Sequence, residues 1–269
     1  MPELPEMETY KKLLQERLTG KRITKVEVER EKSLNVPADE LILNVQNRIV
    51  TGLSRRAKHV LFHLDDGHTL IVHLMLGGWM FYGTEEEKPD RTSQVTLSFG
   101  DRHLYFIGLR LGYLHWLGPD ELRERMAAYG PEPFDPALDE AAFDRLLRRK
   151  RSVLKPLLVD QKELAGIGNC YADEFCFHAG INPKRRTGDL STEDTARLLH
   201  SMRYVLTDAM RLGGYMESPL YPGDTLTGGY NDSCRVYDRG GEPCLQCGQP
   251  IVQEELNSRK LFYCSNCQR

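Results

Sequence analysis

The chain opens with Met1-Pro2-Glu3-Leu4-Pro5-Glu6, and the first helix and its chemistry both follow from this hexapeptide. Pro5 suits the first helical position, where no backbone N–H is needed, and apolar residues at helical spacing continue to Leu18. If Met1 is removed, Pro2 carries a free secondary amine, and an ordinary α-amino group with a pKa of roughly 8 is partly unprotonated at neutral pH. Such an amine can form an iminium with an aldehyde, and Glu3 offers a carboxyl group for proton transfer. The alternative is a short start peptide ahead of an ordinary helix.

Length, charge and hydropathy restrict the class of protein. The 269 residues, 40% of them hydrophobic, suffice for one or two domains with a buried core. No apolar stretch approaches the roughly 18 residues of a membrane span, and the acidic, helical N-terminus is unlike a signal peptide, so we expect a cytoplasmic protein. We also expect a monomer. The net charge of -3 argues against nucleic-acid binding by the chain as a whole and leaves that role to local basic clusters.

The first 118 residues predict one helix and a twisted antiparallel β-sandwich, and hence an α+β fold. Two hairpin signals, Asp66-Gly67 and Gly100-Asp101, are each flanked by strand-like runs. The strand pattern begins near Ile23. Further strands are expected at residues 59–64, 69–76, 94–99, 103–107 and 113–117.

The pattern becomes helical after Gly118. A short helix and the stiff stretch 129–133 make residues 119–134 a linker. Residues 135–232 predict a helical domain, in which a glycine turn at 166–168 separates two helices and a capping box at Ser191 and Asp194 starts a long third helix. Its end, from residue 215, is expected to be an irregular loop. Residues 233–269 form the last domain.

Four cysteines in this last domain have the spacing of metal ligands. Two Cys-x2-Cys pairs are separated by sixteen residues, which predicts one tetrahedral zinc ion in a reducing compartment. One function is to staple a segment too small to fold alone. Another is to present Arg259, at the tip of a hairpin, to a phosphate. The four predicted ligands are Cys244, Cys247, Cys264 and Cys267.

Local basic clusters surround the helical turn. Residues 148–151 precede Lys155, residues 184–186 follow, and the exposed amides at the helix start near Asn169 predict an anion site. A charge run is usually only a solvated face, but three basic clusters beside a zinc hairpin favour a polyphosphate partner. Lys58 heads a strand and either projects from a loop edge into a site or is an ordinary surface lysine.

These pieces, in this order, resemble the formamidopyrimidine-DNA glycosylase and endonuclease VIII family of DNA repair enzymes. The resemblance spans essentially the whole chain and favours the formamidopyrimidine branch, whose zinc finger and linker have this form. The matching motifs are Met1–Glu6, Arg56–Lys58, Tyr129–Pro133, the helix-two-turn-helix Asp160–Glu174, and Cys244–Arg269.

The resemblance implies a two-domain enzyme acting on double-stranded DNA with a damaged or abasic nucleotide, which is flipped out of the stack. The Pro2 amine would attack C1′ of the sugar and expel the base, and the iminium would acidify C2′ so that β- and then δ-elimination cuts the strand. Catalytic roles are implied for Pro2, Glu3 and Lys58. Roles in binding DNA are implied for Glu6, Leu76, Leu109, Arg110, Leu111, Lys155, Asn169 and Arg259.

Three of these positions depart from the family pattern. Leu76 stands where the formamidopyrimidine branch has a methionine, Leu109 where it has an arginine, and Leu111 where it has a phenylalanine. These side chains fill the gap left by the flipped base, and leucine cannot hydrogen-bond the orphaned partner base. Tyr215 replaces a common serine in the loop that covers 8-oxoguanine. We therefore expect a lesion preference other than ordinary 8-oxoguanine specificity.

Three hypotheses for function follow. The first is a bifunctional glycosylase and abasic-site lyase with altered lesion preference. The second is a catalytically silent binder of damaged DNA or DNA structures, motivated by the altered loops and by an acylated Pro2 if Met1 is retained. The third is a protein-interaction zinc ribbon on an unrelated sandwich.

Overall fold

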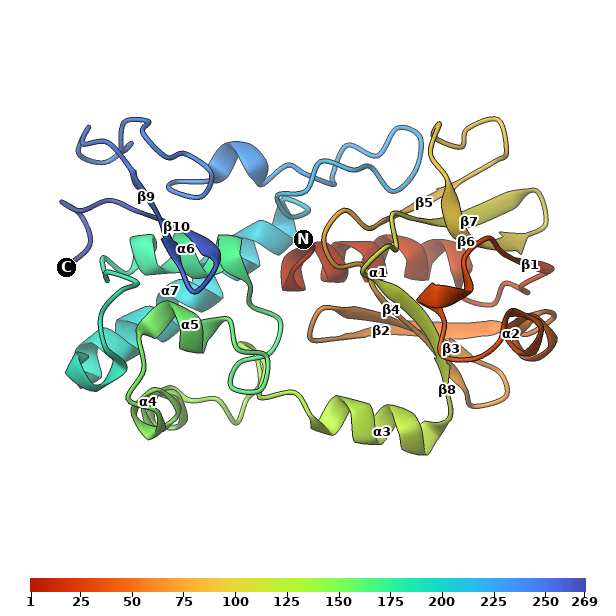
Figure 1. The fold of residues 1–269 in the computed structure, drawn as a ribbon, viewed down its shortest axis with the longest axis horizontal. Coiled ribbons are helices and arrows are strands. Elements are labelled where there is room, and N and C mark those ends of the chain that lie inside the picture. The colour runs from red at the N-terminus through yellow and green to blue at the C-terminus, as the bar shows by residue number, and fades with distance from the viewer. The chain divides into compact units, whose positions relative to one another are not determined.

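Helix α1 (Leu4–Leu18) runs through the first of two structural units in the computed structural model, which describes residues 1–269 (Figure 1). The helix begins one residue earlier than the position of Pro5 suggests, and it ends at Thr19, whose N–H bonds back to the Gln15 carbonyl. One side of the helix is apolar at every turn, which is why it is buried against the strands. The fully buried apolar side chains are Leu4, Met7, Tyr10, Leu14 and Leu18.

Two four-stranded antiparallel sheets pack on each other and confirm the predicted β-sandwich. Phe62 and Phe106, from different sheets, meet edge to face in the core with ring centroids 6.3 Å apart. Gly67 and Gly100 adopt positive φ at the two predicted hairpin turns. One sheet has the order β1 (Lys25–Val28), β6 (Ser93–Phe99), β7 (Arg102–Ile107), β5 (Trp79–Gly83), and the other β2 (Val50–Arg56), β3 (His59–Leu64), β4 (Thr69–His73), β8 (Tyr113–Leu117).

A second helix in this unit, α2 (Ala38–Val45), is absent from the sequence prediction. It is only two turns long and buries just Leu41 and Val45, so its periodic signal is too short to stand out. The short helix α3 (Pro119–Ala127) confirms the prediction after Gly118, and a single 3-10 turn, η1, spans Glu31–Ser33.

The second unit is helical, as predicted, and carries a two-stranded ribbon. Ser191 and Asp194 cap α7 reciprocally: the Ser191 N–H donates to Asp194 Oδ2 at 3.2 Å and the Asp194 N–H to Ser191 Oγ at 3.1 Å. The capping box therefore stops this helix from starting earlier. The elements are α4 (Glu140–Arg149), α5 (Leu154–Leu158), α6 (Asn169–His178), η2 (Thr187–Asp189), α7 (Thr192–Arg211), β9 (Val252–Leu256) and β10 (Arg259–Tyr263), with the turn η3 (Asn231–Ser233) at the unit boundary.

The segment Leu212–Asn231 differs from the predicted domain boundary. The sequence analysis placed it with the helical domain 135–232, but it clusters with Met1–Ala127. The reason is a long-range anchor: Leu220 is fully buried in the sandwich core, and its carbonyl oxygen accepts the Tyr82 N–H at 2.6 Å. No helix of the protein combines the length and the apolar character needed to cross a membrane.

Candidate functional site

The residues at the start of α1 are buried although two of them are charged. Pro2, Glu3 and Glu6 are all buried there. Glu6 Oε2 accepts the Glu3 N–H at 2.7 Å, so the carboxylate satisfies one of the N–H groups that a helix start leaves without a partner. A carboxylate at this end also interacts favourably with the helix dipole. Glu6 therefore supports the helix start.

The Glu6 carboxylate also holds the loop within Leu212–Asn231, which is distant in sequence but belongs to the same unit. Glu6 Oε1 accepts the Tyr215 N–H at 2.9 Å. Gly214 has a φ of 77°, and an added Cβ would lie 2.3 Å from Glu6 Oε1, so only glycine fits this approach. The contact was not predicted, because no local pattern in the sequence indicates it.

Lys58 lies in the two-residue turn between β2 and β3 and is 5% exposed, so the interpretation as an ordinary surface lysine is wrong. Ala57, beside it, takes a φ of 52°, which is uncommon for a residue other than glycine. Arg55 connects the turn to α1, because its guanidinium donates to Glu8 at 3.0 Å and to the Ala57 carbonyl at 2.9 Å. The turn is thereby held close to the helix that follows Pro2.

A histidine and tyrosine cluster next to this turn was not foreseen. His59 Nε2 lies 2.8 Å from the Tyr113 hydroxyl, and the His59 and His73 rings are 4.7 Å apart. Burial lowers the pKa of His59 to about 3. Burial, reinforced by the charge of Lys58, lowers the pKa of His73 to about 4. Both rings are neutral at physiological pH, so neither histidine adds positive charge beside Lys58 and Arg125.

The two loops predicted to enter DNA lie against each other. An added Cβ on Gly108 would lie 2.1 Å from the Gly77 carbonyl oxygen, so the backbones are nearly in contact. Leu76 and Leu111 are 68% and 65% exposed, so both side chains are accessible at the surface of the first unit. Arg110 is also exposed.

The side chain of Leu109 is not at the surface, where its implied role in binding DNA would place it. Its side chain is fully buried in the sandwich core, its N–H donates to Gln94 Oε1 at 2.8 Å, and its carbonyl accepts from Ser33 Oγ at 3.0 Å. A leucine at this position is drawn into the core, where burial of its apolar surface is favourable. Leu109 therefore anchors the loop from inside instead of contacting a base.

In the second unit, α5 and the β9–β10 turn line a pocket of about 500 Å³. Arg259 and Lys162 contribute positive charge to its wall, and Asn257 lies at the turn, where φ is 51°. Asn169 is the first residue of α6, and its partly buried side chain leaves Oδ1 without a hydrogen bond. Arg259 is exposed, as a phosphate contact requires.

Lys155, which the resemblance places along the DNA-facing edge of the helical domain, lines the same pocket as Arg259 but is held by internal partners. The side chain is buried, with 2% of the residue exposed, and its Nζ lies 2.7 Å from Asp173 Oδ2 and 2.7 Å from the Lys260 carbonyl oxygen. Asp173 Oδ2 also accepts the Phe262 N–H at 3.0 Å. The lysine thus joins α5 to α6 and to the β10 strand, because a buried charge is tolerated only with partners.

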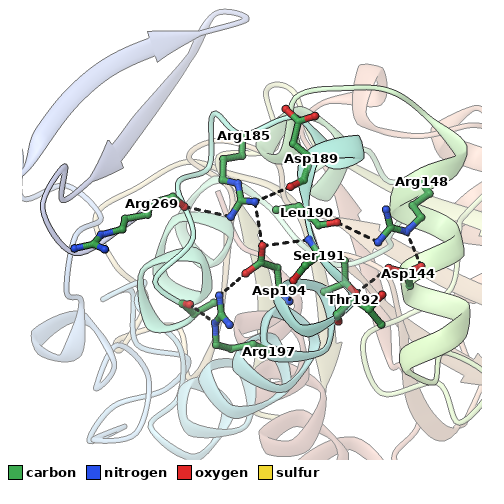
Figure 2. A network of polar contacts seen from close by, with 12 residues as sticks. Asp144, Arg148, Arg185, Asp189, Leu190, Ser191, Thr192, Asp194, Arg197 and Arg269 are labelled. Atoms are coloured by element: carbon green, nitrogen blue, oxygen red, sulfur yellow. Dashed lines mark hydrogen bonds and ion pairs between the residues drawn. The ribbon is translucent and has the colours of Figure 1, made fainter.

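Most of the predicted basic clusters are neutralised within the unit. Figure 2 shows Arg185 and Arg197 converging on Asp194, at 3.0 and 2.6 Å, and Arg148 paired with Asp144 at 2.7 Å. These ion pairs hold the helices and the segment between them together. The clusters therefore contribute less free positive charge than their sequence suggests. Further internal partners are Glu163 for Arg149 and Lys150, and Glu254 for Lys184.

The four predicted zinc ligands come together. Their Sγ atoms all lie within 4.8 Å of one another, with Cys244 and Cys267 at 3.9 Å and Cys247 and Cys264 at 3.5 Å. A tetrahedron of thiolates with Zn–S bonds of about 2.3 Å has edges of about 3.8 Å. The cluster therefore fits one structural zinc ion. Glu174 braces the segment that precedes it, accepting the N–H groups of Arg235, Val236 and Tyr237.

Comparisons with known proteins agree along the whole chain. Residues 1–113 match the formamidopyrimidine-DNA glycosylase N-terminal domain, residues 129–218 its H2TH domain, and residues 241–269 the zinc finger found in FPG and IleRS. The formamidopyrimidine-DNA glycosylase of Pelotomaculum thermopropionicum is 33% identical over all of this chain and 99% of its own, and that of Methylococcus capsulatus is 38% identical over both full lengths.

Solved structures give the same answer. Lactococcus lactis Fpg bound to DNA containing N7-benzyl-Fapy-dG has a TM-score of 0.91 and 30% identity over all of both chains. The complex of that enzyme with DNA containing an abasic site has a TM-score of 0.92 and 29% identity over 99% of both chains. These matches exclude an unrelated sandwich with a zinc ribbon, and the chain belongs to the formamidopyrimidine-DNA glycosylase family.

Proposed function

We propose that this family member is a bifunctional enzyme of base excision repair, which removes a damaged base and cuts the abasic strand through a Schiff base on Pro2. The observation that carries the proposal is the corner at the start of α1, where Pro2, Glu3 and Glu6 are buried together. Arg55 holds the Lys58 turn to the same helix. A buried, immobile amine beside a carboxyl group is the arrangement that nucleophilic attack and proton transfer require.

In this mechanism the Pro2 nitrogen adds to C1′ of the sugar as the base leaves with the electron pair of its bond. The ring then opens to an iminium, which withdraws electrons from the C2′–H bond, so a base can remove that proton and expel the 3′ phosphate. A second elimination releases the 5′ phosphate. Glu3 handles protons at the sugar, and Lys58, Asn169 and Arg259 bind phosphates of the strand. The zinc ion keeps the β9–β10 hairpin, and with it Arg259, in place.

We further propose an altered lesion preference. Leu76 and Leu111 are exposed and apolar, so they can occupy the gap left by a flipped nucleotide by stacking and exclusion of water. Neither can donate a hydrogen bond to the orphaned base. Since Leu109 is buried in the core, discrimination of the opposite base by this loop rests on Arg110 alone. The preference for cytosine opposite the lesion is therefore expected to be weak.

Borohydride trapping tests the chemistry. A duplex with one abasic site is mixed with protein whose Pro2 terminus has been verified by intact mass, and reduction should yield a covalent protein–DNA adduct. Pro2→Gly should slow adduct formation, because a primary amine is less fixed in direction, and acylation of the amine should abolish it. No adduct from protein with a verified Pro2 terminus would refute the proposal.

The alternative is a catalytically silent binder of damaged DNA, which the protein would be if Met1 stays on the chain. Intact mass of the purified protein distinguishes the two, because retained Met1 makes Pro2 an amide without a basic nitrogen. A panel of oxidised purine, oxidised pyrimidine and abasic duplexes, scored separately for base release and nicking, then identifies the lesion.

A further inference from the structure

The hydroxyl group of Tyr215 lies at the first peptide unit of the chain. Its oxygen accepts an N–H of the Met1 ammonium at 3.2 Å, and it donates to the Met1 carbonyl oxygen at 3.1 Å. Only two covalent bonds, together about 2.6 Å long, separate that carbonyl oxygen from the Pro2 nitrogen. The phenol is therefore next to the atom on which the proposed chemistry depends.

This placement is built into the fold. One carboxylate, that of Glu6, accepts the N–H of Glu3 through one oxygen and the N–H of Tyr215 through the other, at 2.7 and 2.9 Å. Gly213 and Gly214 both adopt positive φ, at 80° and 77°. The loop is also held from behind, because the Gly214 carbonyl accepts the Tyr230 N–H at 2.9 Å. Glu3 and Tyr215 are thus both held by the carboxylate of Glu6.

Removal of Met1 would change the partners of the phenol in a defined way. Two hydrogen bonds of the Tyr215 hydroxyl are made with Met1 and are lost when Met1 is removed. When Met1 leaves, the Pro2 amine is created in their place. A hydroxyl that already accepts a hydrogen bond from an ammonium is chemically suited to accept one from this amine.

We propose that Tyr215 positions the Pro2 nucleophile by accepting a hydrogen bond from the single N–H of its neutral amine. This inference rests on the proposed function of Pro2. A neutral proline amine has one N–H and one lone pair, so fixing the N–H fixes the direction of the lone pair, which then faces the sugar carbon. As the new N–C bond forms, the nitrogen becomes positive and its N–H becomes a stronger donor, so the hydrogen bond is tighter in the transition state. Tyr215 keeps its own proton throughout.

The test compares Tyr215→Phe with Tyr221→Phe. Tyr221 is on the same loop, and its ring packs on the Arg17 guanidinium, 3.8 Å from the ring centroid, a contact that phenylalanine retains. Each variant loses only a hydroxyl group. The rate of borohydride trapping on an abasic duplex is measured across pH with saturating protein, together with the Kd for the duplex, and a Pro2 terminus is verified for every preparation.

Tyr215→Phe should lower the plateau rate by about tenfold, the value of one hydrogen bond to a charged group. It should also move the acid limb of the profile to lower pH by about half a unit, because a hydrogen bond that favours the charged amine raises the pKa of that amine. The Kd should not change, and Tyr221→Phe should match the unmodified protein in all three measurements.

Tyr215→Ser adds a second check, since a serine oxygen on the same backbone is too short to reach the terminus and should behave like phenylalanine. If Tyr215→Phe leaves both the plateau and the acid limb unchanged, or if Tyr215→Ser is as fast as the unmodified protein, the role of Tyr215 is refuted. If the unmodified protein itself forms no adduct, the proposed role of Pro2 fails instead, so the two failures are distinguishable.

Discussion

Lys155 provides the sharpest test of the structure, because the sequence predicts a DNA contact and the structure shows a buried ion pair. Lys155→Met retains most of the apolar stem but removes the charge, and it leaves Asp173, whose pKa burial already raises to about 7, without its cationic partner. The two groups are 2.7 Å apart with side chains 3% and 0% exposed. Breaking a buried pair from one side costs about 3–5 kcal/mol, so the second unit should lose that much stability.

Two measurements are needed, because two units are not expected to unfold in a single two-state transition. Urea unfolding followed by far-UV circular dichroism reports both units, and release of zinc to a coloured chelator reports the second unit. Lys155→Met combined with Asp173→Asn should recover most of the loss, since the amide oxygen can still accept the Phe262 N–H and no charge remains unpaired.

The salt dependence of DNA affinity tests whether a given lysine or arginine contacts a phosphate. Arg259→Ala removes an exposed cation and should reduce the slope of log Kd against log salt by about 0.9, the loss of one phosphate contact. Lys155→Met should leave that slope unchanged in conditions where the protein is still folded. The buried pair would be refuted if Lys155→Met were as stable as the unmodified protein and reduced the slope of log Kd against log salt by about one. Lys155 would then contact DNA, as the sequence predicts.

Three further predictions follow from the structure. Because burial lowers the pKa of His59 to about 3, the unfolded state binds more protons below pH 6.5, and this group alone should lower stability by about 2 kcal/mol from pH 7 to pH 5. His73, whose pKa is lowered to about 4, adds a loss in the same direction, and a flat profile in urea titrations would contradict both. Cys267→Ser should release zinc and lower the stability of the second unit, while the melting of the first unit should not change. An equal loss of stability in both units would show that zinc does not stabilise the second unit alone. Gly214→Ala should lower the melting temperature more than Gly20→Ala. Both glycines have φ near 80°, but only at Gly214 would an added Cβ clash with the Glu6 carboxylate. Equal effects would show that the Glu6 side chain moves aside at little cost.

The sequence by itself determined the features that depend on short stretches of chain. The hairpins at Gly67 and Gly100 follow from turn chemistry, and the capping box at Ser191 follows from side chains three residues apart. The zinc cluster follows from the spacing of its cysteines, since tetrahedral thiolate coordination accepts few other arrangements. The family resemblance, carried by such motifs, was confirmed along the whole chain.

Only the tertiary structure decided which side chains are buried and what they face. Lys155 is paired with a residue 18 positions away and bonded to a carbonyl 105 positions away, and Leu109 is held in a core made from distant strands. The contact between Met1 and Tyr215 spans 214 positions. Periodicity and spacing describe neighbours in the chain, whereas the burial of a charge or the approach of a phenol depends on partners that only the folded chain brings together.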